Sequence, residues 1–146
     1  MRDFKLPVPD SYIAYGDWWL PEPNERAARQ LLCQGKQEGG NPRPTAILCG
    51  GDPIAMTVLN VARALNIRVP RDLSVVGYGN FTLATYADPP LTTIAEPFHD
   101  MGRSAVKQLL TRIANRNDDW NNSPLNEVLP THLVVRSSTA PPGHPV

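Results

Sequence analysis

At 146 residues, the chain is long enough for one domain with a modest hydrophobic core. Its 14 lysine and arginine residues balance 14 acidic residues and form no cluster, which argues against a nucleic-acid-binding surface. No apolar run reaches the roughly 20 residues of a membrane span, and the first residues lack the apolar stretch of a secretory signal, so we expect a cytoplasmic protein. Cys33 and Cys49 have neither CxxC nor metal-ligand spacing, and we interpret them as reduced thiols in or near the core.

Hydrophobic periodicity, together with proline and glycine punctuation, predicts strands and helices that alternate along the chain. Strands are expected at residues 11–16, 45–49, 73–78, 91–94, 128–129 and 132–136. Helices are expected at residues 22–34, 52–65 and 98–114. Irregular segments are expected at residues 1–10, 17–21, 36–43, 81–90 and 115–126, with a proline-rich end from residue 137. This order predicts an α/β fold in which helices flank a mostly parallel sheet.

The stretch from residue 44 to residue 80 is central to this prediction, because its pattern predicts a strand, a helix and a second strand. Asp52 can cap the free N–H groups of the helix, and Pro53 suits its first position. Asn66 is a plausible helix stop. The buried face of the helix is expected to carry Ile54, Val58, Val61 and Leu65. Such a unit predicts two parallel neighbouring strands joined by a right-handed crossover.

Three loops follow expected strands, at residues 17–19, 50–52 and 79–81. In open α/β sheets, ligands bind in the crevice at the carboxyl ends of the strands. These loops combine small or polar residues with an aromatic residue or a helix N-terminus. The combination suits a small polar ligand with a flat face, such as a sugar or a nucleobase.

No catalytic, metal or cofactor motif accompanies these loops. Gly77-Tyr78-Gly79 lacks the third glycine and the following helix of a dinucleotide loop. The chain has no GxSxG elbow and no carboxylate pair that we can place on one face. The histidines are scattered along the chain, at His99, His132 and His144. None of them has a Glu or Cys at the spacing of a metal site. We therefore expect a binding protein without a metal or cofactor, and no enzyme.

From Gly16 onward, several landmarks occur together in one order. They are Gly16-Asp17-Trp18, Pro44-Thr45-Ala46-Ile47, the segment 67–78, Pro89-Pro90-Leu91-Thr92-Thr93-Ile94, Met101-Gly102 and the closing segment 133–142. With these landmarks, nearly the whole chain resembles the effector-binding domain of LacI/GalR-family bacterial transcription regulators. The segment 67–78 is the most specific of them.

The resemblance implies a partial periplasmic-binding-protein-like (type I) fold. Residues 11–138 would form mainly the C-terminal lobe without its first strand, between an N-terminal remnant at 1–10 and a proline-rich tail at 139–146. The helix at 97–114 packs on the other lobe in family members, so its face with Gly102, Val106, Leu109 and Ile113 should be partly bare and prone to self-association. Family members bind operator DNA through a headpiece that this chain does not show, so we expect no specific DNA binding by the chain alone.

The resemblance also assigns aromatic site residues. Trp18 matches the aromatic residue that stacks on the effector ring, although it could instead pack at the rim of the next helix. Trp19 is expected to pack. Phe98 matches an apolar residue of the pocket wall, with simple core packing as the alternative.

Two glycines depart from the family pattern. Gly51 stands where many relatives carry a polar ligand-binding side chain, and Gly79 where relatives often carry an acidic one. Both departures argue for a changed ligand or none. Asn80 could substitute in part as donor and acceptor, and Asp52 is expected to be a helix cap first and a ligand neighbour second.

The function implied is the ligand-sensing portion of a DNA-binding transcriptional regulator such as a repressor, with a sugar or purine-like effector. Family members are homodimers, and Met56, Phe81 and Tyr86 resemble the subunit-contact surface, with ordinary surface as the alternative. Two other functions stay open: a sugar-binding protein of a transporter, and a small α/β enzyme, which only the fold would support.

Overall fold

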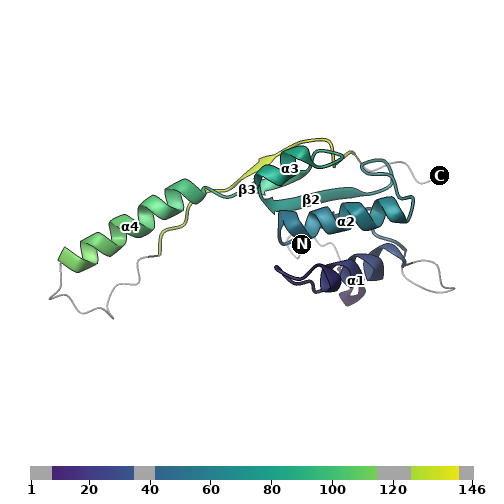
Figure 1. The fold of residues 1–146 in the computed structure, drawn as a ribbon, viewed down its shortest axis with the longest axis horizontal. Coiled ribbons are helices and arrows are strands. Elements are labelled where there is room, and N and C mark those ends of the chain that lie inside the picture. The colour runs from purple at the N-terminus through teal and green to yellow at the C-terminus, as the bar shows by residue number, and fades with distance from the viewer. Residues whose placement is uncertain (1–7, 35–41, 115–125, 142–146) are drawn as a thin grey trace.

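The computed structural model describes residues 8–34, 42–114 and 126–141 of the chain. In chain order, the elements are η2 (Asp10–Tyr12), α1 (Pro21–Leu32), β1 (Ala46–Leu48), α2 (Asp52–Ala64), β2 (Ser74–Gly79), α3 (Thr82–Tyr86), β3 (Thr92–Ala95), α4 (Phe98–Ala114) and β4 (His132–Val134). Figure 1 shows a body formed by the sheet and α1 to α3, from which α4 projects. None of the helices in these ranges combines the length and apolarity needed to cross a membrane.

The sheet has four strands in the order β1-β2-β3-β4. β1 and β3 both pair with β2 in parallel, with Ile47 opposite Val75 and Gly77 opposite Thr93. β4 pairs with β3 in the antiparallel direction. The prediction of a mostly parallel sheet flanked by helices is confirmed, and the unit β1-α2-β2 is the expected crossover.

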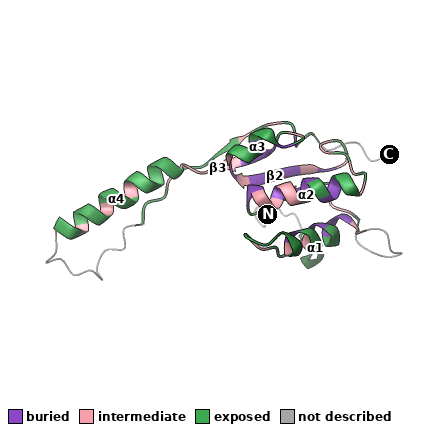
Figure 2. Ribbon diagram, in the orientation of Figure 1, coloured by how far each residue is buried: buried purple, intermediate pink, exposed green. Residues whose placement is uncertain are grey.

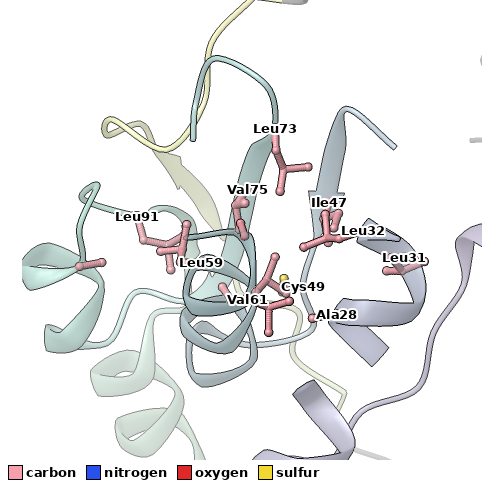
Figure 3. Packing of buried hydrophobic residues seen from close by; sticks show 14 of the residues in the cluster. Ala28, Leu31, Leu32, Ile47, Cys49, Leu59, Val61, Leu73, Val75 and Leu91 are labelled. Carbon is pink, nitrogen blue, oxygen red and sulfur yellow. The ribbon is translucent and has the colours of Figure 1, made fainter. Parts of the chain in front are cut away.

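The core lies between the sheet and the two helices α1 and α2, which pack side by side. Ala28 and Leu32 of α1, Ile47 of β1 and Val75 of β2 meet in this layer (Figure 3). The predicted face of α2 is confirmed, with Val58 and Val61 buried and its other predicted members partly buried. Burying this continuous apolar layer supplies the main favourable term in folding.

The carboxyl end of α2 follows the predicted stop. Asn66 has a φ of 56°, in the left-handed region, and its N–H donates to Arg63 O at 3.0 Å. The N–H of Ile67 donates to Ala62 O at 2.9 Å. These two bonds satisfy carbonyls that the helix end would otherwise leave without partners.

Three predicted elements are wrong. The segment 11–16 is no strand: Tyr12 and Ile13 donate to Pro9 O and Asp10 O within η2, and residues 13–16 pair with no strand in the described part of the chain. The local turn uses backbone groups that a strand would offer to a neighbour. The segment 81–90 contains α3, and residues 128–129 are irregular. Predicted segments 36–41 and 115–125 lie outside the described residues.

The C-terminal segment joins the sheet beyond β4. Ser138 is fully buried, its Oγ donates to Val75 O at 2.6 Å, and it accepts the N–H of Thr92 at 2.8 Å. The N–H of Val75 donates in turn to Ser138 O. The start of the predicted proline-rich end therefore belongs to the folded body.

Helix α4 has the predicted bounds at Phe98 and Ala114, but it contains no buried residue. Figure 2 shows it exposed or of intermediate burial along its length, with no buried segment. The prediction of a partly bare apolar face is confirmed, since Val106, Leu109 and Ile113 are each more than half exposed.

Candidate functional site

The three predicted loops meet at the carboxyl edge of the parallel strands. The indole of Trp18 lies directly over Gly51, where a Cβ would collide with the ring. The N–H of Phe81 donates to Asp52 Oδ2 at 2.7 Å, which joins the other two loops. An open hollow of about 350 Å³ is lined by Trp18, Pro53, Phe81, Thr82 and Leu83. The expectation that these loops come together is confirmed.

Asn24 of α1 fixes the loop that carries Trp18. Its side chain is buried and makes two bonds with Asp17: Oδ1 accepts the N–H at 2.7 Å, and Nδ2 donates to the carbonyl at 2.7 Å. Asp17 Oδ1 accepts the N–H groups of Trp19 and Leu20. As a result Trp18 turns toward Gly51, whereas Trp19 is 84% exposed. The prediction that Trp19 packs is wrong, because the turn at Asp17 directs the two indoles apart.

Asp52 is fully buried and does not cap α2, so the cap prediction is wrong. The N-cap position belongs to Gly51, and the carboxylate of Asp52 reaches across to β3 and to the loop after β2. Thr93 Oγ1 donates to Asp52 Oδ1 at 2.6 Å, beside the bond from the Phe81 N–H. Gly77 makes this possible, because a Cβ there would fall on Asp52 Oδ1 and within 2.8 Å of Leu91 Cδ2. Burial of a carboxylate is tolerated because both oxygens are hydrogen-bonded.

Asn80 is held by Arg136. Its φ is 56°, and its Oδ1 accepts Nη2 of Arg136 at 2.7 Å. The same guanidinium donates from Nη1 to Leu91 O at 2.7 Å, and it reaches Thr85 Oγ1 at 3.3 Å. The amide oxygen predicted to face a ligand is therefore engaged in fixing the loop.

Phe81 and Phe98 stack with ring centroids 5.6 Å apart and an interplanar angle of 24°. This contact joins the hollow to the first residue of α4, where Phe98 is 47% exposed. Phe81 thus lines the hollow, although the sequence associates it with a subunit surface. Of its companions there, Tyr86 is 82% exposed, and Met56 packs partly against the core.

Glycine suits position 79, because any larger residue there would strain the backbone and collide with a neighbouring ring. The φ of Gly79 is 119°, and a Cβ would lie 2.6 Å from the ring of Phe81. Gly51 and Gly79 are each covered by an aromatic ring, of Trp18 and Phe81 respectively. At both positions an aromatic ring therefore packs on bare backbone.

A second hollow of about 500 Å³ lies at the amino ends of the strands. It is lined by Leu59, Arg63, Asn66, Ile67, Arg68, Val69, Asp88 and Pro89. Its arginines are engaged, because Arg63 pairs with Asp88 and Arg68 with Asp72. No group of three potential metal ligands occurs within the described ranges. The carboxyl-edge hollow, although smaller, presents the aromatic faces and lies where parallel sheets bind ligands.

Three residues that build the site escaped the sequence-based predictions: Asn24, Thr93 and Arg136. A polar residue on an otherwise apolar helix face was a usable signal for Asn24. Thr93 and Arg136 act across 41 and 56 residues of chain, on Asp52 and Asn80, and no local pattern marks such pairs.

Residues 11–139 match the family model described as periplasmic binding protein-like domain. Over 140 residues, the chain is 39% identical to the HTH-type transcriptional repressor PurR of Escherichia coli, an alignment that covers 96% of this chain and 38% of the repressor. A solved complex of the transcriptional regulator CelR with cellobiose is similar with a TM-score of 0.78 and 31% identity, over 94% of this chain and 38% of that one. A LacI-type transcription regulator from Bifidobacterium animalis subsp. lactis has a TM-score of 0.79 and 31% identity, over 95% of this chain and 46% of that one. The chain thus spans less than half the length of these relatives.

Proposed function

Because the chain belongs to the periplasmic binding protein-like domain family, we propose that it is the effector-binding portion of a LacI/GalR-type transcriptional regulator. Its relatives are transcriptional regulators of this kind. The chain would contribute one wall of a ligand site, and its role is binding without catalysis. Effector binding would shift the population between two arrangements of the regulator, which requires different affinities for the two.

The observation that carries this proposal is the pair of aromatic rings at the carboxyl edge. Trp18 and Phe81 face one hollow from two different loops. Each ring is held in place, Trp18 through Asn24 and Phe81 through Asp52. Fixed aromatic faces bind flat ligands at a low cost in conformational entropy.

The effector class follows from what lines the hollow. We propose a sugar or a purine-like molecule, because the ring faces can stack on either. Glycine at positions 51 and 79 offers backbone without side-chain donors, and the Asn80 amide oxygen is engaged by Arg136. Recognition would then depend mainly on stacking, with hydroxyl or ring-nitrogen contacts supplied by the other wall of the site. Phe98 would complete the apolar wall through its contact with Phe81.

The remaining partners are part of the same proposal. A regulator of this family would act in the cytoplasm, bind operator DNA through a separate headpiece, and form a homodimer. Met56 lies on α2 and Tyr86 on α3. The side chain of Tyr86 is exposed and is therefore available for a subunit contact.

A thermal-shift panel with cellobiose, ribose, hypoxanthine and guanine tests the proposal on the chain itself. A ligand at 100 times its dissociation constant stabilises the native state by about 2.7 kcal/mol, which raises Tm by several degrees. The Trp18→Ala variant should lose the shift, and the matched Trp19→Ala variant should keep it. A shift retained in full by Trp18→Ala, or lost equally in Trp19→Ala, would contradict the proposal.

A further inference from the structure

Arg136 holds the loop that carries Phe81, although it does not itself line the carboxyl-edge hollow. Its own N–H donates to Thr92 Oγ1 at 2.9 Å, and its Nη1 donates to Leu91 O at 2.7 Å. These two bonds anchor Arg136 to the start of β3. From this anchor, Nη2 donates to Asn80 Oδ1 at 2.7 Å. Hydrogen bonds from a charged donor are roughly twice as strong as neutral ones, so Arg136 ties the loop after β2 firmly to β3.

The backbone of Asn80 depends on this tie. Its φ of 56° lies in the left-handed region, directly after the φ of 119° at Gly79, and residues other than glycine visit this region at a cost. Asn66 has the same φ at the end of α2, where backbone hydrogen bonds close the helix. At Asn80 the N–H reaches Thr93 Oγ1 at the long distance of 3.4 Å. The bond from Arg136 is therefore the shortest contact that holds this turn.

The segment that follows Asn80 forms much of the wall of the hollow. Phe81 and the first two residues of α3 line it. The N–H of Phe81 is held by Asp52, and the turn before it is held by Arg136. The same Nη2 lies 3.3 Å from Thr85 Oγ1, so the guanidinium also reaches α3.

We propose that Arg136 is a positioning residue of the effector site, which holds Asn80 in the left-handed conformation and thereby keeps the ring of Phe81 at the hollow. The proposal rests on the proposed function, since the ring serves to face an effector. A ring whose position is fixed before the ligand arrives binds at a lower cost in conformational entropy. Loss of the Arg136 side chain should therefore weaken binding, although Arg136 does not touch the ligand.

Hydrogen exchange of the full chain tests the positioning without a ligand. The readout is the protection of the Phe81 N–H relative to that of the Cys49 N–H, which bonds to β2 at 2.8 Å. Arg136→Gln should lower this ratio about tenfold, because the turn opens locally. A general loss of stability would lower both protections by the same factor. The matched variant Arg63→Gln loses two bonds at the opposite edge of the sheet and should leave the ratio unchanged.

A double-mutant cycle on binding tests the route through Asn80. Isothermal titration calorimetry uses the compound among cellobiose, ribose, hypoxanthine and guanine that raises Tm most. Arg136→Gln should raise the dissociation constant about tenfold, the factor that corresponds to one hydrogen bond from a charged group. Asn80→Gly permits the same φ without the side chain. In that background, Arg136→Gln should raise the constant by about threefold or less, through the longer contact with Thr85.

The two measurements separate this proposal from the proposed function. An unchanged protection ratio in Arg136→Gln overturns the role of Arg136 whether or not a compound binds. Binding that is lost in Trp18→Ala but unchanged in Arg136→Gln overturns it as well and leaves the effector site standing. Additive effects of Arg136→Gln and Asn80→Gly overturn the route through Asn80. Absence of binding by all four compounds bears on the proposed function alone, because the exchange measurement needs no ligand.

Discussion

Replacing Asp52 with alanine should destabilise the fold more than any surface substitution of the same kind. The fully buried carboxylate accepts one bond from the Phe81 N–H and one from Thr93 Oγ1, at 2.7 Å and 2.6 Å. Hydrogen bonds to a charged group contribute about 1.5–3 kcal/mol each, and two donors would be left without acceptors. We expect the free energy of unfolding to fall by about 3–5 kcal/mol, out of the roughly 5–15 kcal/mol typical of a domain.

Urea denaturation followed by far-ultraviolet circular dichroism measures this loss. Asp52→Asn keeps the volume and one acceptor oxygen, so it should cost about 2 kcal/mol. Asp88→Ala is the matched control, because Asp88 is exposed and paired with Arg63, and an exposed pair contributes about 0–1 kcal/mol. A loss below about 1 kcal/mol for Asp52→Ala, equal to that of the control, would show that the two buried hydrogen bonds contribute no more than an exposed ion pair.

A double-mutant cycle with Gly77 isolates the contact. Gly77→Ala places a methyl group on Asp52 Oδ1 and near Leu91, so it should be destabilising by itself. In the Asp52→Ala background, part of that clash disappears. The two effects should therefore be less than additive, by about 1 kcal/mol or more. Full additivity would show that Gly77 does not accommodate the carboxylate.

Three further predictions follow from local geometry. Asn66→Gly should be neutral or stabilising, whereas Asn66→Ala should cost about 1 kcal/mol, because φ is 56° there; urea melts measure both. Burial and the charge of Asp52 raise the pKa of Cys49 to about 12, so a thiol reagent should label Cys33 first and Cys49 only after unfolding. The hydrogen bond from Arg68 lowers the pKa of Asp72 from 3.8 to about 2. Asp72 therefore stabilises the fold above its ordinary pKa, and the stability difference between wild type and Asp72→Asn should vanish as the pH falls from about 4 to about 2.

Elements whose bounds depend only on neighbouring residues in the chain could be predicted from the sequence. Helix α4 has the predicted first and last residues, because its periodicity and its opening proline are contained within the segment. The stop at Asn66 is equally local. The loops at residues 50–52 and 79–81 could also be placed, because parallel strands in a crossover unit must end at the same edge of the sheet. The loop at residues 17–19 reaches this edge without the strand that was predicted before it.

Features that depend on distant partners could not be predicted. Asp52 has the sequence context of a helix cap, but Thr93 and the loop after β2 draw its side chain away from the helix end. The segment 11–16 has a strand pattern but pairs with no strand among the described residues, and its first residues form η2 instead. Arg136 shows no local sign that its side chain fixes Asn80.

The residues at which a ligand binds show whether the carboxyl-edge hollow is the site. Nuclear magnetic resonance spectra of the chain, titrated with any compound that raises Tm, report which indole and amide groups shift. We expect the largest changes at the Trp18 indole and the Phe81 amide, with Trp19 unaffected. Shifts centred on Arg68 and Val69, at the opposite edge of the sheet, would contradict the account.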